Sequence, residues 1–293
     1  MIDLISTKKL VTFDDYKCNY RATRIRLDRH RIESLMKSKH IDSIDFVSVG
    51  RFSNVFCGIH RKSNKSIIIK VVLKEELAKS GGSIIKRTLP YDQLFLSDKI
   101  SKTYEIFTTR SYLIVLSDYY EENLAQLLLA NRGPMREQSV HQLFRLILSA
   151  LNHMHSLKIA HRNLKLENIM LKDSSWPVLA DFNYTIVVED LGDASKLFSN
   201  TSLYSAPEIN SHRPYDPMVA DVWNLGICLF VILTNSFPFP SAVYVNDSNY
   251  LNSFMEMDKI LSDQAKSTLE LMLEFDPNRR IVTEKLSKNS WFS

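Results

Sequence analysis

Residues 161–168 read HRNLKLEN, and residues 181–183, which read DFN, follow them in the middle of the chain. Asn168 and Asp181 are thirteen positions apart. Taken alone, Asn and Asp are most often turn formers. As an amide oxygen and a carboxylate in two neighbouring motifs, they also suit Mg²⁺, which proteins bind with few oxygen ligands together with phosphate groups. The pair is therefore a candidate metal site.

The sequence on the N-terminal side of these motifs predicts strands. Short segments rich in Val, Ile and Phe are separated by turn-prone residues, which is typical of a sheet. These segments are residues 46–49, 55–60, 66–73, 104–108 and 112–116. Apolar residues at helical spacing between Ile84 and Ile100 predict one helix among the strands.

On the C-terminal side, from Tyr119 onward, the apolar spacing becomes helical. Residues 140–154 and 265–273 each predict a helix, and residues 221–234 are apolar nearly all round, which indicates a buried helix. A part that is mainly antiparallel sheet, followed by a mainly helical part, predicts an α+β fold with two lobes. Residues 117–120 are the expected hinge.

The composition is that of a soluble globular protein. Of the 293 residues, 45% are hydrophobic and 24% are charged, and the apolar run at 227–233 is too short to cross a bilayer. Residues 1–10 lack the long apolar core of a signal peptide. Three cysteines without metal-ligand spacing favour a reducing compartment. We therefore expect a monomeric, cytoplasmic protein that binds neither membranes nor nucleic acid.

The net charge of +4 is unevenly distributed. Residues 1–40 carry ten Lys and Arg side chains against five Asp and Glu. Such a segment is most simply a solvated, partly ordered extension. The alternative is an arm that docks an acidic partner. Both interpretations make residues 1–42 a basic N-terminal extension.

Six motifs, taken together and in this order, resemble those of the protein kinase superfamily. Residues 161–168 resemble its catalytic loop and residues 181–183 its metal-binding motif. The other four are residues 67–70 (IIIK), 206–208 (APE), 221–226 (DVWNLG) and 276–280 (DPNRR). The resemblance implies a two-lobed protein kinase domain at residues 43–292, with an N-lobe at 43–117 and a C-lobe at 120–292.

Within the superfamily, the chain resembles the testis-specific serine/threonine kinases of the calmodulin-kinase-like group. The segments that carry this resemblance are residues 89–90 (LP), 102–107 (KTYEIF), 214–217 (PYDP) and 276–280. Kinases of this kind transfer the γ-phosphate of ATP to protein hydroxyl groups with the help of Mg²⁺. ATP, Mg²⁺ and protein partners are therefore the expected ligands.

The resemblance implies how the N-lobe contacts ATP. Lys70 falls where the family places the lysine that contacts the α- and β-phosphates, and Asp92 falls where that lysine's usual partner, a Glu, stands. Aspartate has the same charge on a side chain one methylene shorter, so the pair would need the helix to move inward. Leu116, Ser117 and Tyr119 lie at the positions of the hinge that contacts the nucleotide.

The family's glycine-rich loop is eroded. Its three glycine positions fall on Ser48, Gly50 and Ser53, so that only one glycine is retained. Glycine lets backbone N–H groups approach phosphates closely, whereas serine keeps the N–H but adds a Cβ. Val55 falls where the family places a residue beneath the adenine ring. We expect nucleotide affinity to be weakened.

Asn163 is the main departure from the family. The family has aspartate there, which serves as the general base, and a neutral amide cannot take up a proton near pH 7. Asn168 and Asp181 are retained as metal ligands, and Lys165 is retained to stabilise the transferring phosphoryl group. His161 is expected to pack in the core rather than act as an acid or base.

The activation segment also departs from the pattern. Leu197 stands where related kinases have a phosphorylatable Thr, so the charge-assisted pairs that the phosphate would make with Arg162 are not expected. Ser195 and Ser199 are alternative acceptors, although serines in such a loop are most often solvated. Asn183 replaces the glycine of the metal-binding motif, and Asn is the residue that best tolerates a left-handed backbone after Gly.

The residues that hold the kinase fold are all present. Asp221 resembles the residue that fixes the catalytic-loop backbone, and Glu208 and Arg280 resemble the buried ion pair of the C-lobe. Three hypotheses remain open. The first is a pseudokinase that acts as a scaffold or a nucleotide-dependent switch, the second is a slow serine/threonine kinase, and the third is an adaptor that binds no nucleotide.

Overall fold

The computed structural model is described for most of the chain and divides into two compact units, which are treated separately below. The described residues are 29–49, 53–75, 94, 96–188, 203–211, 214–239 and 261–292. The small unit contains residues 29–75 and 101–121 of this set, and the large unit contains the rest. Most of the helix predicted between Ile84 and Ile100 lies outside the described residues.

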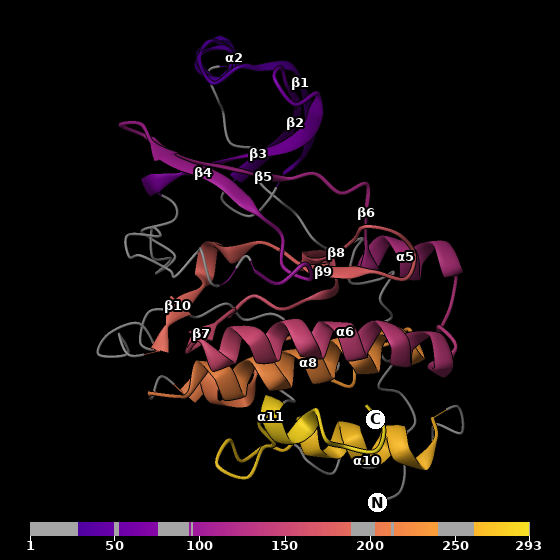
Figure 1. The fold of residues 1–293 in the computed structure, drawn as a ribbon. Coiled ribbons are helices and arrows are strands. Elements are labelled where there is room, and N and C mark those ends of the chain that lie inside the picture. Colours follow the sequence, from indigo (N-terminus) through magenta and orange to yellow (C-terminus); the bar gives the residue numbers. More distant parts are fainter. Residues whose placement is uncertain are drawn as a thin grey trace, which may run out of the picture. The chain divides into compact units, whose positions relative to one another are not determined.

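The small unit is built on a five-stranded antiparallel sheet with the strand order β1-β2-β3-β5-β4 (Figure 1). The strands are β1 (Ile41–Val49), β2 (Ser53–His60), β3 (Lys65–Leu73), β4 (Thr103–Thr108) and β5 (Tyr112–Asp118). The five predicted strands are confirmed, but β1 begins five residues early. A register shift between Asp42 and Asp45, with a positive φ of 52° at Ser43, breaks the alternation that marks a strand in the sequence.

A helix, α2 (Arg29–Ser38), precedes the sheet and packs on it. Ile32 and Met36, one helical turn apart, are 2% and 0% exposed, and Ile41 at the start of β1 is 1% exposed. They share a cluster with side chains from three strands: Phe56, Ile67, Ile69, Val71, Ile114 and Leu116. Ile32, Met36 and Ile41, which lie in the segment that the sequence assigns to an extension, therefore contribute to this unit's core.

The large unit is mainly helical. Its helices are α5 (Leu124–Asn131), α6 (Glu137–Ser156), α8 (Pro217–Thr234), α10 (Asp263–Met272) and α11 (Thr283–Leu286). Short strands complete it: β6 (Glu122–Asn123) pairs with β8 (Ile169–Leu171), β8 with β9 (Pro177–Leu179), and β7 (Ile159–Ala160) with β10 (Ile186–Val187). The three helices predicted after Tyr119 are confirmed as α6, α8 and α10.

Helix α8 forms the centre of the large unit, next to α6 (Figure 1). Asp216 caps its first turn by accepting the N–H of Met218 at 2.8 Å. Gly226 allows α10 to approach, because a Cβ there would lie 2.9 Å from Cδ2 of Leu273. With 18 residues and a mean hydropathy of 1.7, α8 is long and apolar enough to span a membrane, but 89% of it is buried, as in the core helices of soluble proteins.

Glu137, the first residue of α6, connects this helix to α10 and to the C-terminal segment through hydrogen bonds. Its carboxylate accepts Oγ–H of Ser262, the N-cap of α10, at 2.6 Å and Nε1–H of Trp291 at 2.9 Å. The ring of His141 packs edge-on against Trp291, with ring centroids 5.3 Å apart. Trp223 and Trp291, 0% and 3% exposed, are core residues.

Candidate active site

The loop at residues 161–165 follows β7 and is anchored by one buried carboxylate. Asp221 on α8 is 0% exposed and accepts the backbone N–H groups of His161 and Arg162, each at 2.7 Å. His155 on α6 also contacts this carboxylate, with 3.2 Å between Nε2 and Oδ2. Arg162 has a positive φ of 64°, a conformation that a non-glycine residue keeps only when its surroundings hold it. The anchoring role predicted for Asp221 is confirmed.

His161 is a buried, neutral member of this loop. Its Nε2 lies 3.0 Å from the carbonyl oxygen of Ala180, and its Nδ1 lies 3.3 Å from the N–H of Asn163. Since a carbonyl can only accept and an N–H can only donate, the ring proton is on Nε2. Burial lowers the pKa of His161, although the charges of Asp221 and Asp181 oppose this. The ring packs edge-on against Phe182, which supports the core role predicted for it.

Asn163, Asn168 and Asp181 come together in the large unit. Nδ2 of Asn163 donates to Oδ2 of Asp181 at 3.2 Å, and the carbonyl oxygen of Asn163 accepts Nδ2–H of Asn168 at 2.7 Å. Asn168 ends the short 3-10 helix η1 (Leu166–Asn168), and Asp181 precedes another, η2 (Phe182–Tyr184). Asn163 is 9% exposed and Asn168 is 7% exposed. Hydrogen bonds therefore connect the HRNLKLEN and DFN motifs through Asn163.

The other charged residues of the loop point to different partners. Glu167 lies 3.5 Å from the hydroxyl group of Tyr204, which donates to its carboxylate. Tyr204 is 1% exposed and belongs to the segment that leads to the APE motif. Lys165 is partly buried on the same loop. Glu167 is the carboxylate nearest to Asn163 in sequence, and it accepts a hydrogen bond from Tyr204 in the activation segment.

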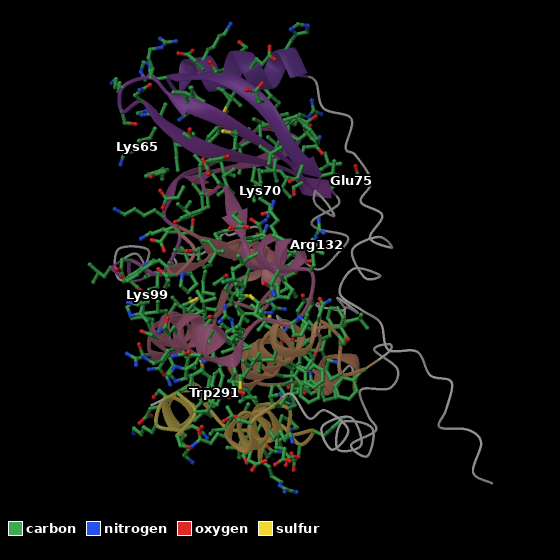
Figure 2. The ribbon with its side chains drawn as sticks, turned by 90° about the vertical axis from the view of Figure 1, so that its right-hand side faces the viewer. Lys65, Lys70, Glu75, Lys99, Arg132 and Trp291 are labelled. Carbon is green, nitrogen blue, oxygen red and sulfur yellow. The ribbon has the colours of Figure 1, made fainter. Side chains whose placement is uncertain are left out.

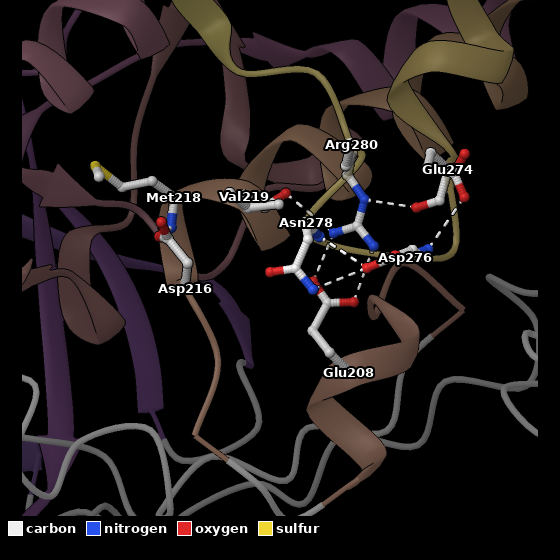
Figure 3. A network of polar contacts seen from close by, with 8 residues as sticks. All are labelled: Glu208, Asp216, Met218, Val219, Glu274, Asp276, Asn278 and Arg280. Carbon is white, nitrogen blue, oxygen red and sulfur yellow. Dashed lines mark hydrogen bonds and ion pairs between the residues drawn. The ribbon is translucent and has the colours of Figure 1, made fainter.

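An ion pair in the large unit forms a second buried polar site (Figure 3). Arg280 binds Glu208 through both Nη atoms, at 2.5 and 2.9 Å. Its Nε donates to the carbonyl of Glu274 at 2.9 Å and Nη1 to that of Val219 at 3.2 Å. The guanidinium also lies over the ring of Trp223, 5.0 Å from its centroid. The predicted ion pair is confirmed, and the arginine side chain is fully buried.

In the small unit, Lys70 lies on β3 (Figure 2). The strand register pairs it with Val55 on β2 and Val115 on β5, so these three side chains share one face of the sheet. Ser53 is 4% exposed at the start of β2, and Ser48 is exposed near the end of β1. Gly50 and Asp92 lie outside the described residues.

The predicted hinge positions separate by sheet face. Leu116 follows Val115 and therefore points to the face opposite Lys70, where it is 4% exposed in the cluster beneath α2. The nucleotide-contacting role of Leu116, Ser117 and Tyr119 stays a prediction. Ser117 pairs with Ile68, which places it on the Lys70 face, and Tyr119 follows the end of β5.

The comparisons with known proteins agree with this geometry. The family model of the protein kinase domain matches residues 43–292. The chain belongs to the protein kinase family. The antiparallel sheet of its small unit and the helices of its large unit are the two lobes of the α+β kinase fold.

The chain is similar to serine/threonine kinases. It is 30% identical to CBL-interacting serine/threonine-protein kinase 15 of Arabidopsis thaliana, over 84% of this chain and 59% of that protein. It is also 30% identical to the carbon catabolite-derepressing protein kinase of Saccharomyces cerevisiae, over 88% of this chain and 41% of that protein. A third relative is the probable serine/threonine-protein kinase MARK-A of Dictyostelium discoideum, 28% identical over 85% of this chain and 24% of that protein. The chain thus spans less than two thirds of each of these relatives.

Protein kinases use ATP and Mg²⁺, and the oxygen atoms near Asn163 fit such an ion. The side-chain NH₂ group of Asn168 donates to the carbonyl of Asn163, so the side-chain oxygen of Asn168 is the atom that could bind the ion. Asp181 could contribute a carboxylate oxygen. Both are hard oxygen ligands of the kind that Mg²⁺ accepts alongside phosphate. Within the described part of the chain, no three His, Cys, Asp or Glu side chains group to hold a metal by themselves.

Arg162, the kinase residue that usually meets an activation-segment phosphate, has other partners here. Its Nη1 lies 3.4 Å from the carbonyl of Tyr184 and it hydrogen-bonds the hydroxyl of Tyr215. Burial raises the pKa of Tyr215, while the arginine opposes that shift. The sequence did not reveal this contact, because Tyr215 is distant in sequence. The substitution at Leu197 lies outside the described residues, as do Ser195 and Ser199.

Proposed function

We propose that this chain is a catalytically impaired protein kinase: a pseudokinase that acts as a signalling scaffold or nucleotide-dependent switch on protein partners. One observation carries the proposal. The side chain at the position of the catalytic base is an amide, and its N–H points at Asp181. An amide has no lone pair that is basic near pH 7, and loss of a positioned base typically costs about 10²–10⁴ in rate.

The residues that would bind ATP are kept in part, which supports a weakened nucleotide site. By the chemistry of the family, Lys70 would contact the phosphates, and Asn168 and Asp181 would hold Mg²⁺. The serines at positions 48 and 53 add a Cβ where the family has glycine. ATP with Mg²⁺ is therefore the ligand that we propose, with reduced affinity.

A slow serine/threonine kinase is the second candidate. Lys70, Lys165, Asn168 and Asp181 are all retained, and a kinase that keeps its metal and phosphate contacts can retain some transfer by positioning alone. The similarity to serine/threonine kinases favours Ser and Thr rather than Tyr as acceptors. This candidate differs from the first only in the amount of activity that remains.

Phosphate transfer from ATP to the chain itself and to generic substrates tests the proposal, with Mg²⁺ and Mn²⁺ in parallel. We expect wild type near background and Asn163→Asp faster by about 10²–10⁴, the usual contribution of a general base. Asp181→Ala is the control that removes metal-dependent transfer. Robust wild-type turnover that Asp181→Ala abolishes would refute the impaired enzyme, and no gain from Asn163→Asp would refute the slow kinase.

Thermal unfolding with MgATP separates the switch from an adaptor that ignores nucleotide. A ligand at 100 times its dissociation constant stabilises a protein by about 2.7 kcal/mol. A rise of the midpoint at millimolar MgATP supports the switch. An unchanged midpoint supports the adaptor.

We also propose a cytoplasmic monomer that acts on protein partners, without binding membranes or nucleic acid. The support is the free thiols of Cys57 and Cys228 and the burial of α8. Membership of the testis-specific branch is a further proposal, carried by residues 89–90, 102–107 and 214–217. Light scattering of the purified chain tests the monomer, and microscopy of the tagged protein tests its location.

A further inference from the structure

The hydrogen bond between Asn163 and Asp181 joins the position of the missing base to a candidate metal ligand. The 3.2 Å between Nδ2 and Oδ2 lies in a region where Asn163 is only 9% exposed. A carboxylate at position 163 in this geometry would place two negatively charged oxygens against each other. Two carboxylates about 3 Å apart cannot both ionise unless a proton or a cation lies between them. The amide removes that requirement because it presents an N–H to an acceptor.

Backbone groups hold Asn163 in this orientation. Its N–H donates to Nδ1 of His161 at 3.3 Å, and its carbonyl accepts Nδ2–H of Asn168 at 2.7 Å. The carbonyl of Asn168 in turn accepts the N–H of Ala180 at 2.9 Å, and Ala180 precedes Asp181. A ring of hydrogen bonds and one peptide unit thus connects Asn163, Asn168, Ala180 and Asp181. Both candidate metal ligands belong to it, and its links are hydrogen bonds between neutral donors and their acceptors.

The backbone conformation of Asp181 requires stabilising contacts of this kind. Its backbone has φ 66° and ψ 71°, in the left-handed region that non-glycine residues adopt at a cost. A residue in this region keeps its conformation only where the surroundings determine it. With a carboxylate at position 163, a bound cation would have to supply the attraction that the amide supplies here.

We propose that Asn163 is a positioning residue that replaces the cation at Asp181. It holds the metal-ligand carboxylate in place without a divalent ion, and as a result nucleotide binding depends little on Mg²⁺. The nucleotide part rests on the proposed function above. The metal-independent hold on Asp181 rests on the geometry alone.

Thermal unfolding of the full chain without nucleotide tests the hold on Asp181, with each protein measured in EDTA and in MgCl₂. The proteins are wild type, Asn163→Asp, Asn163→Ala and Asn64→Asp, an exposed turn residue that controls for an added charge. We expect equal midpoints in the two buffers for wild type and Asn64→Asp. Asn163→Asp should unfold earlier than wild type in EDTA and recover with Mg²⁺. Asn163→Ala, which loses the donor without adding charge, should recover by a smaller amount.

Two results would overturn the hold. One is a rise with Mg²⁺ in wild type as large as that in Asn163→Asp, and the other is no rise in either Asn163 variant. If Asn163→Asp does not fold in either buffer, the comparison of wild type with Asn163→Ala decides: a larger rise in the alanine variant supports the hold, and equal rises overturn it.

Binding of a fluorescent ATP analogue in the same two buffers tests the nucleotide part. For each protein we take the dissociation constant of the analogue in EDTA divided by that in Mg²⁺. This ratio should be about 10–100-fold larger for Asn163→Asp than for wild type, because changes to the neighbours of metal ligands alter metal affinity by that range. Equal ratios overturn this part, and so does a wild type that binds no analogue in either buffer. The latter result would also refute the nucleotide-dependent switch, whereas the unfolding experiment would still decide the role of Asn163.

Discussion

Asp221 and Asn163 are two buried polar side chains of the large unit, and their neighbours differ in kind. Asp221 faces two backbone N–H donors at 2.7 Å, and Asn163 faces the acceptor carboxylate of Asp181 at 3.2 Å. A carboxylate suits the first environment, because it can only accept, and an amide N–H suits the second. An exchange of Asp for Asn therefore has opposite consequences at the two positions. The loop can lose its base and still pair the side chain at position 163 with an acceptor.

The Glu208–Arg280 pair extends the comparison to opposite charges. Both partners are charged and buried, so neither can be neutralised without leaving the other uncompensated. At Asn163 and Asp181 the family places two like charges, and the neutralisation of one relieves repulsion. Buried charge is thus retained where it is complementary and lost where it was costly.

We expect the largest loss of stability when the buried Glu208–Arg280 ion pair is broken. Arg280→Met keeps an apolar stem beside Trp223 but leaves the Glu208 carboxylate without its cation, and we expect a loss of about 3–5 kcal/mol in the free energy of unfolding. The control Arg279→Met changes the next residue, whose side chain is 74% exposed and 3.4 Å from Glu274. Its loss should stay below about 1 kcal/mol. Urea denaturation measures both, and similar losses would contradict the distinction between buried and exposed pairs.

An apolar anchor in the small unit should come next. Met36→Ala removes a side chain that is 0% exposed between α2 and the sheet. Core truncations of this size cost about 2–5 kcal/mol. Lys37→Ala, on the exposed side of the same helix, should change stability by no more than about 0.5 kcal/mol. If both variants unfold at the same urea concentration as wild type, α2 is not part of the core.

A mirror-image substitution tests the Asp221 side directly. The carboxylate of Asp221 accepts from the N–H groups of His161 and Arg162, whereas in Asp221→Asn one of its two oxygens becomes an NH₂ donor. Because one charged hydrogen bond is then lost, we expect the free energy of unfolding to fall by about 1.5–3 kcal/mol. Asp216→Asn is the matched control on α8, because Asn caps a helix as well as Asp does. We expect it to change the free energy of unfolding by about 0.3 kcal/mol. An Asp221→Asn protein as stable as the control in urea would show that the comparison between positions 163 and 221 fails.

Sequence patterns predicted the strands of the small unit, the helices α6, α8 and α10, and the partners that meet in the large unit. They succeeded because apolar periodicity and ordered motifs report burial and chain path directly. The start of β1 was missed because a bulge interrupts its alternation. Helix α2 was missed because, among its residues whose burial the structure describes, only Ile32 and Met36 are buried. The face of the sheet on which Leu116 lies follows from the register between β3 and β5, which the sequence alone does not record.

By itself, the sequence determined that this chain is built like a kinase and that an amide stands where a base is expected, since both follow from residue type and order. The tertiary structure alone decided where that amide points, that Arg162 meets Tyr215, and that Ile32, Met36 and Ile41 contribute to the core of the small unit. These are contacts between residues far apart in the chain. Their geometry depends on how the backbone returns to the same place, which no local pattern records.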